Sequence, residues 1–280
     1  AWKSSLALDI DLPWGLVGSA EYTHIQSEDA IAYLLPNVGV PKGQLPDGRD
    51  SYWKVFPTPG AGIGTGTNNG AFPEINTRST LLTNTDKGSS DSLVLSLAKA
   101  RSHGFAGDFS VIFTKSTEVN TGSSSQAYSN YNAVPRFNPN EIVEDPSRFN
   151  VPLSVKTSLS WEHAFFGDNR TSVTMYYNGR DGLPYSWVFG GDVNGDAVAT
   201  DVDLAYIPKE NDSIVTYKAG TTADQIAAFN HLIDSDPYLS KHRGEVALRN
   251  HSQQPLINQL DLGIQQELPG FFDENKCVVR

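Results

Sequence analysis

The chain has 280 residues, with 21 Lys and Arg against 32 Asp and Glu, which gives a formal net charge of −11. This acidity argues against binding to nucleic acid, because phosphate contacts require a basic face. A single cysteine, Cys277, excludes an internal disulfide framework. No run of about 18 apolar residues predicts a transmembrane helix, but a membrane-spanning β-strand needs only about 9–11 alternating residues.

Alternation of apolar and polar residues is the dominant pattern along the chain. In residues 90–102, for example, Leu93, Leu95 and Leu97 are separated by single residues of mostly smaller or polar type. A period of two places such leucines on one face of a β-strand. Strands are predicted on this basis over residues 4–12, 16–25, 78–85, 90–102, 105–119, 151–165, 171–189 and 256–268, with a last strand after Pro269-Gly270.

The connections between these strands alternate in length. The tight turns lie at residues 13–15, 103–104, 167–169 and 269–270, whereas the intervening connections run to tens of residues. The glycine-rich stretch 60–66 lacks the spacing of a nucleotide-binding loop and predicts a surface loop. One segment, residues 222–239, has helical spacing, with Thr221 or Thr222 as its cap, and predicts a small helix packed in a loop.

An acidic stretch near residue 200 has the spacing of a calcium-binding loop. Side-chain oxygens stand at loop positions 1, 3, 5, 9 and 12, which are Asp192, Asn194, Asp196, Thr200 and Asp203. The match departs from the motif at two positions, because Ala197 stands where the turn prefers glycine and Asp203 replaces a longer Glu. Residues 171–189 before this stretch and 204–207 after it have extended, strand-like patterns, and the alternative interpretation is an acidic, turn-rich loop that joins these two strands.

This asymmetry of turns is typical of outer-membrane β-barrels, which have short periplasmic turns and long extracellular loops. Lipid cannot hydrogen-bond to the backbone, so spanning strands must pair fully and turn apolar side chains to the lipid and polar ones to the lumen. Trp2, Trp14, Tyr22, Trp161 and Phe165 lie near predicted strand ends, where an aromatic girdle is expected. The alternative is a large soluble β-sandwich or solenoid, which should have shorter strands and turns every 8–12 residues.

Three stretches resemble the Oar-like branch of the TonB-dependent outer-membrane receptors. They are residues 81–88 (LLTNTDKG), the acidic loop 191–196 continuing to 203–208 (DLAYIP), and Arg249-Asn250 followed by 258–268 (NQLDLGIQQEL). Their order and spacing agree with that family over most of the chain. Ala197 departs from the family's usual glycine, and Leu256 follows Pro255 where an aromatic residue is expected.

The resemblance implies a barrel of about 22 strands with a plug, of which this chain supplies the middle-to-late part. We therefore expect an all-β, antiparallel up-and-down transmembrane β-barrel, here partial with roughly 8–10 strands, with long extracellular loops and one short loop helix. Residues 1–280 are expected to form one partial barrel domain that lacks the plug and the C-terminal strands. The implied location is the outer membrane of a Gram-negative cell. The implied partners are outer-membrane lipid, an unidentified extracellular ligand and, through the missing plug, the TonB complex.

Three functional classes are weighed against each other. The first is a receptor or transporter segment, and the second is a structural or adhesive surface protein whose acidic loops bind calcium. The third is a secreted enzyme that uses Asp192 with Asp196, or His231 and His242; it is disfavoured because no nucleophile elbow or HExxH spacing occurs. The sequence thus predicts a non-enzymatic protein with no cofactor other than Ca²⁺ at the acidic loop.

Overall fold

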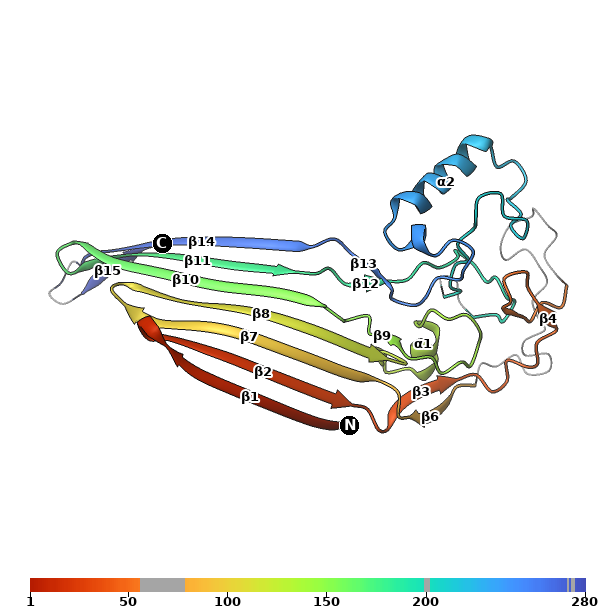
Figure 1. Cartoon of the computed structure of the whole chain (residues 1–280), viewed down its shortest axis with the longest axis horizontal. Helices are drawn as coiled ribbons and strands as arrows, with labels where there is room; N and C mark the ends of the chain where they lie inside the picture. The colour runs from red at the N-terminus through yellow and green to blue at the C-terminus, as the bar shows by residue number, and fades with distance from the viewer. Residues whose placement is uncertain (56–78, 199–201, 271, 273–274) are drawn as a thin grey trace.

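The computed structural model describes residues 1–55, 79–198, 202–270, 272 and 275–280. It shows a long curved sheet with most of the connecting chain gathered at one end (Figure 1). The sheet has nine strands, and every pairing within it is antiparallel. They are β1 (Trp2–Leu12), β2 (Leu16–Gln26), β7 (Ser89–Ser102), β8 (Phe105–Glu118), β9 (Asp145–Pro146), β10 (Leu153–Phe166), β11 (Asn169–Arg180), β14 (Ile257–Pro269) and β15 (Lys276–Val279).

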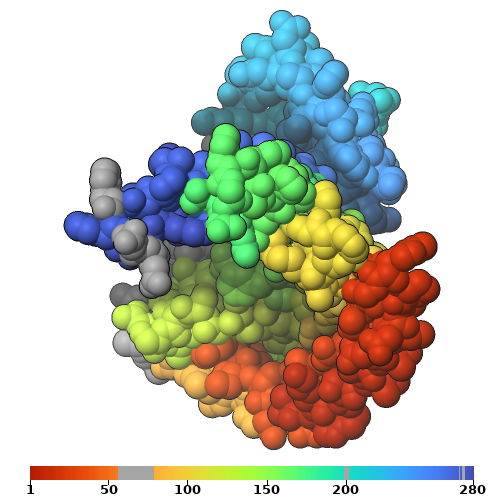
Figure 2. Space-filling model, turned by 90° about the vertical axis from the view of Figure 1, so that its left-hand side faces the viewer, coloured from red at the N-terminus to blue at the C-terminus, as the bar shows by residue number. Residues whose placement is uncertain are grey.

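The strands of this main sheet follow one another in chain order. The order is β1-β2-β7-β8-β10-β11-β14-β15, and the short β9 pairs with the end of β8. Within the described residues, the outer edge of β1 has no partner strand, so the sheet is open. Viewed along the strands in Figure 2, the successive hairpins follow an arc. The prediction of an antiparallel all-β fold is confirmed at this level.

All tight turns lie at the same end of the main sheet, which we call the turn end. The 3-10 turn Pro13–Gly15 joins β1 to β2, His103-Gly104 joins β7 to β8, and Gly167-Asp168 joins β10 to β11. His103 and Gly104 both have positive φ, at 53° and 84°, which suits a two-residue hairpin turn because it matches the twist of the strands. The three long connections, from β2 to β7, from β8 to β10 and from β11 to β14, begin and end at the opposite end, as the sequence predicts.

The register of the main sheet separates apolar from polar side chains. Leu8, Ala20, Leu95, Val111 and Val155 form one row across β1, β2, β7, β8 and β10. The adjacent row contains Asp9, Ser19, Ser96, Ser110 and Lys156.

We call the two sides of the main sheet the apolar face and the polar face. The apolar face is open to its surroundings: Leu8 is 67% exposed and Leu262, on β14, is 71% exposed. The packed core of the protein therefore does not lie against this face.

The buried core lies instead among the long connections, which we call the loop layer (described parts of residues 27–88, 119–152 and 181–256). One cluster joins Leu35, Val38, Tyr52, Tyr131, Val198 and Val202, and a second joins Ile207, Ile233, Leu239 and Ala247. Besides β9, the loop layer contains β3 (Ala30–Leu34), β4 (Gly43–Gln44), β5 (Asp50–Ser51), β6 (Leu81–Thr85), α1 (Ala127–Asn132), β12 (Pro184–Tyr185), α2 (Ala223–Ser235), the 3-10 turn η2 (Leu239–Lys241) and β13 (Ser252–Gln253).

The helices differ in part from the prediction. Thr222 caps α2 with a capping box, in which its hydroxyl and the Gln225 side chain each bond the other's backbone N–H. This helix ends at Ser235 rather than at residue 239, because Pro237 disfavours helical geometry in the residue before it.

The prediction of a single loop helix is wrong, because α1 is a second one. Its Ser- and Asn-rich sequence has weak helix propensity, and it is held by tertiary contacts. The Asn130 amide donates to the Ser124 carbonyl at 2.7 Å and to the Tyr33 hydroxyl at 3.1 Å. Neither α1 nor α2 is long and apolar enough to cross a membrane.

The strands expected on both sides of the acidic loop are also shorter than predicted. β11 ends at Arg180 rather than at residue 189, and residues 204–207 make only isolated bridges, Val188 with Leu204 and Tyr206 with Val246. Leu204 and Ile207 are buried in the loop layer, and backbone hydrogen bonds to residues 136, 187 and 245 also hold this segment. The glycine-rich stretch 60–66 lies outside the described residues.

Candidate functional site

The acidic loop folds back on itself through its own side chains. Both Asp192 carboxylate oxygens accept backbone N–H groups, from Gly195 at 2.6 Å and from Ala197 at 3.1 Å. Asn194 accepts from the Asp196 N–H at 3.0 Å, and Asp196 accepts from the Val198 N–H at 2.8 Å. These bonds are typical of Asx turns, and they order the loop around inward-pointing oxygens.

The end of the predicted motif is joined to its beginning. Asp203 accepts the Val193 N–H at 2.7 Å, so loop position 12 lies beside position 2. Ala197, at position 6, adopts φ = 59°, the left-handed conformation for which that position prefers glycine. Thr200 lies outside the described residues. The structure thus brings four of the five predicted ligand residues into one compact loop.

Two side chains from the segment before residue 56 fasten the acidic loop. Trp53 donates its ring N–H to the Val193 carbonyl at 2.8 Å. Gly195 faces this ring so closely that a Cβ there would lie 2.6 Å from a ring carbon. Arg49, fully buried, donates to the Leu204 carbonyl at 2.5 Å and lies 3.6 Å from an Asp203 oxygen. A guanidinium from a distant segment therefore supplies positive charge to the acidic cluster.

Negative charge in the acidic loop is nevertheless poorly compensated. Burial, with further contributions from Asp203 and Asp192, raises the pKa of Asp196 to about 7. Burial also raises the pKa of Asp203 to about 6, although Arg49 acts in the opposite direction. A bound cation would favour the ionised form of both groups. Yet among the described residues no three His, Cys, Asp or Glu side chains are grouped closely enough to hold a metal ion.

The side chains of Asp192, Asn194, Asp196 and Asp203 carry carboxylate and amide oxygens, which are the donors that calcium prefers. In the structure, several of those oxygens already accept hydrogen bonds from backbone N–H groups. Binding would therefore require the carboxylates of Asp196 and Asp203 to turn toward a shared centre. Calcium at this loop stays a prediction.

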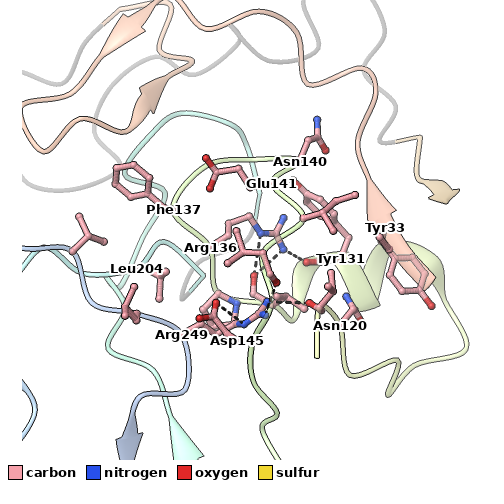
Figure 3. Close-up of a pocket in the computed structure, with 18 of the residues that line it drawn as sticks. Tyr33, Asn120, Tyr131, Arg136, Phe137, Asn140, Glu141, Asp145, Leu204 and Arg249 are labelled. Atoms are coloured by element: carbon pink, nitrogen blue, oxygen red, sulfur yellow. Dashed lines mark hydrogen bonds and ion pairs between the residues drawn. The ribbon is translucent and has the colours of Figure 1, made fainter. Parts of the chain in front are cut away.

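A pocket of about 320 Å³ lies beside the acidic loop in the loop layer (Figure 3). Its walls come from all three long connections and are mostly carbon, with Tyr33, Phe137, Val143, Leu204 and Leu248 among them. Two guanidiniums, Arg136 and Arg249, and two carboxylates, Glu141 and Asp145, also line it. Such a lining accommodates a small apolar group that carries a hydrogen-bonding function.

Arg249 is the structural centre of this pocket. It donates to the carbonyls of Val119 at 3.0 Å, Glu118 at 2.8 Å and Val143 at 2.9 Å, and lies 3.5 Å from the Asp145 carboxylate. Only 5% of its surface is exposed, and burial lowers its pKa. The planar guanidinium thereby ties the end of β8 to the last long connection.

Arg136 also lines the pocket and links it to the acidic loop. Its guanidinium lies 3.6 Å from the centre of the Tyr131 ring and donates to the Tyr131 and Val134 carbonyls. Its backbone pairs with Val202 and Leu204 at the end of the acidic loop. Movement of Val202 or Leu204 would therefore also move Arg136 in the pocket wall.

The residues named for an enzymatic alternative have other partners. The His242 ring bonds the Glu245 carboxylate at 2.9 Å and stacks on Tyr238 at 4.3 Å. His231 lies on α2. Asp192 and Asp196 are hydrogen-bonded within the acidic loop, as described above.

Sequence reasoning missed Arg49, Trp53 and Arg136 entirely and assigned no role to Arg249. Each is a single residue in a loop that contacts a segment far away in the chain, Arg136 through its backbone and the others through their side chains, so no local pattern marks it. No protein family, curated protein or solved structure matches this chain.

The buried carboxylates predict a distinctive pH dependence of stability in the absence of metal. The folded pKa of Asp196, about 7, lies above its ordinary value of 3.8, so the neutral carboxyl stabilises the fold. That contribution is complete below pH 3.8 and is lost as the pH rises through about 7. In chelator, we expect Asp196→Asn to reduce the fall in Tm between pH 5 and pH 8, measured by tryptophan fluorescence.

The matched control is Glu210→Gln, which changes an exposed acid outside the acidic loop. It should leave the pH dependence of the unaltered protein in place. Parallel curves for Asp196→Asn and the unaltered protein would contradict a buried, partly neutral Asp196.

Proposed function

We propose that this chain forms a wall segment and the outer loop layer of a TonB-dependent outer-membrane receptor of the Oar-like group, which takes up a scarce ligand into a Gram-negative cell. The observation that carries the proposal is the sidedness of the main sheet. Long antiparallel strands, 14 residues each in β7, β8 and β10, present an exposed apolar face and a polar face. Lipid on one side and water on the other would satisfy both faces.

The apolar face is too extensive to be explained as scattered surface hydrophobics. Exposed leucine, isoleucine and phenylalanine side chains follow one another on β1, β7, β8 and β14, for example Leu6, Leu95, Phe113 and Ile264. Soluble monomers rarely leave contiguous apolar patches of this kind uncovered. Acyl chains would cover this face without a partner protein.

Aromatic side chains gather at the turn end of the apolar face. Trp161 stacks on His163 at 5.9 Å and meets Phe105 at 6.2 Å, and Phe165 contacts both Trp161 and His163. Amphipathic rings prefer the boundary between acyl chains and head groups. Their position supports a membrane boundary near the tight turns, with the loop layer on the opposite, outer side.

The pocket and the acidic loop then lie where a receptor meets its ligand. The pocket of about 320 Å³ offers the apolar lining and the few polar groups expected of a small-ligand site. Transport, the plug and the TonB complex enter the proposal through the family resemblance alone.

Membrane insertion is tested by quenching of tryptophan fluorescence in vesicles of brominated lipid. Trp161 is on the apolar face, whereas Trp187 packs against the second core cluster of the loop layer. We expect the chain to insert, the quenched fraction to fall in Trp161→Phe, and the quenched fraction to rise in Trp187→Phe. A chain that stays monodisperse in buffer without detergent and is not quenched would contradict the proposal.

The second candidate is a structural or adhesive surface protein that binds calcium. Burial raises the pKa of Asp196 and Asp203, and a bound cation would favour their ionised forms, which supports this candidate. It differs from the first candidate in needing metal for its role.

Terbium luminescence tests calcium binding directly, because Trp53 adjoins the acidic loop and can sensitise a bound lanthanide. We expect terbium emission on tryptophan excitation, and we expect added Ca²⁺ to abolish it by displacing terbium. The double variant Asp192→Ala/Asp196→Ala should lose most of this emission. Glu210→Gln should keep the emission. Unchanged emission and unchanged protease resistance of the loop in the double variant would refute the calcium hypothesis.

A further inference from the structure

A groove of about 640 Å³ lies on the apolar face of the main sheet, at the turn end. Its walls are mostly carbon and come from β2, β7, β8, β10 and β11, with Leu16, Phe105, Leu159, Trp161 and Met175 among them. The polar residues Lys99, Ser102, His103, Asp108 and Ser160 also line it, and the register turns the Asp108 side chain to the polar face. These residues belong to adjacent rows of the sheet register, so the groove is a depression in a continuous apolar surface.

Gly107 creates the depth of this groove. It lies between Lys99 on β7 and Leu159 on β10 in the register of the sheet. A Cβ at Gly107 would lie 2.6 Å from a Leu159 methyl and 2.8 Å from the Ser158 carbonyl oxygen. Any larger residue would therefore displace Leu159 and fill the floor, and the hollow depends on glycine at this position.

Lys99 places a positive charge at one side of the groove. It shares its row with Leu16 and Gly107 on the apolar face, and its ammonium group reaches the Trp14 carbonyl in the β1–β2 turn at 2.6 Å. One hydrogen bond leaves two of the three ammonium donors available. A long side chain that lies along apolar surface and extends its charge toward the turn is typical of residues at a membrane boundary.

This charge is not matched by an acid on the same face. Among the described strands, the apolar face carries one acidic side chain, Asp91, near the opposite end of β7. Asp91 is already bonded to the Tyr22 hydroxyl at 2.6 Å and the His24 ring at 2.8 Å, and Lys115 lies opposite it in the register. The turn end of the apolar face thus combines an apolar hollow with an unmatched cation.

We propose that this groove binds an anionic phospholipid, with an acyl chain in the hollow above Gly107 and the phosphate at the Lys99 ammonium. The inference rests on the proposed function, because it requires the apolar face to meet a bilayer. If the long loops lie outside the cell, the turn end meets the inner leaflet of the outer membrane, and a phospholipid rather than lipid A is the ligand that fits. Basic residues near a membrane surface favour anionic lipids by about fivefold each.

The test uses the whole chain reconstituted in vesicles that contain equal amounts of phosphatidylglycerol and phosphatidylethanolamine. After extraction in mild detergent, the lipid that stays bound is counted by native mass spectrometry. We expect phosphatidylglycerol to be retained over phosphatidylethanolamine by about fivefold. Lys99→Gln should abolish this preference, and Gly107→Val should reduce retention of both lipids.

Lys156→Gln is the matched control, because Lys156 lies on the polar face and should not meet lipid. Retention without preference in the unaltered chain, or an undiminished preference in Lys99→Gln, would overturn the lipid site while leaving membrane insertion intact. Preferential retention of lipid A when it is supplied would overturn the assignment to phospholipid. Failure of the chain to enter vesicles at all would overturn both this inference and the proposed function.

Discussion

The division of the main sheet into an apolar and a polar face is the constraint on which the rest of the structure depends. Backbone hydrogen bonding holds the strands in register, and the period of two then fixes which side each residue occupies. A shift of one residue between β8 and β10 would move Val111 and Val155 out of a shared row. The tight turns preserve this register at one end, and at the other end the loop layer carries the two buried clusters of the described residues.

The loop layer depends on buried polar contacts more than on apolar volume. Arg49 and Arg249 each join segments that lie far apart in the chain, and Arg249 alone satisfies three carbonyl groups. Removing a buried charge partner costs far more than a surface pair contributes, so these arginines act as cross-links. The acidic loop and the pocket share this scaffold through Arg136, which touches both.

Sequence reasoning reached the strands because alternation is a local signal. Leu93, Leu95 and Leu97 predict both the strand and its apolar face, and the helical spacing after Thr221-Thr222 predicts α2 but leaves open which threonine caps it. It missed α1, whose residues 127–132 form a helix only through contacts with other segments. The spacing of its acidic residues predicts the acidic loop. Its contacts with Arg49 and Trp53 could not be predicted, because those two residues lie far from the loop in the chain.

The two-faced character of the main sheet is tested most directly by mapping which side chains of β8 face lipid in vesicles. Nitroxide spin labels placed singly at Phe109, Ser110, Val111 and Ile112 report collisions with oxygen, which concentrates in acyl chains, and with a water-soluble nickel chelate. Oxygen accessibility should be high at Phe109 and Val111 and low at Ser110 and Ile112, with the nickel chelate showing the reverse pattern. Uniformly low accessibility at all four positions would mean that the leucine and phenylalanine rows are covered by protein, and it would contradict a sheet that separates lipid from water.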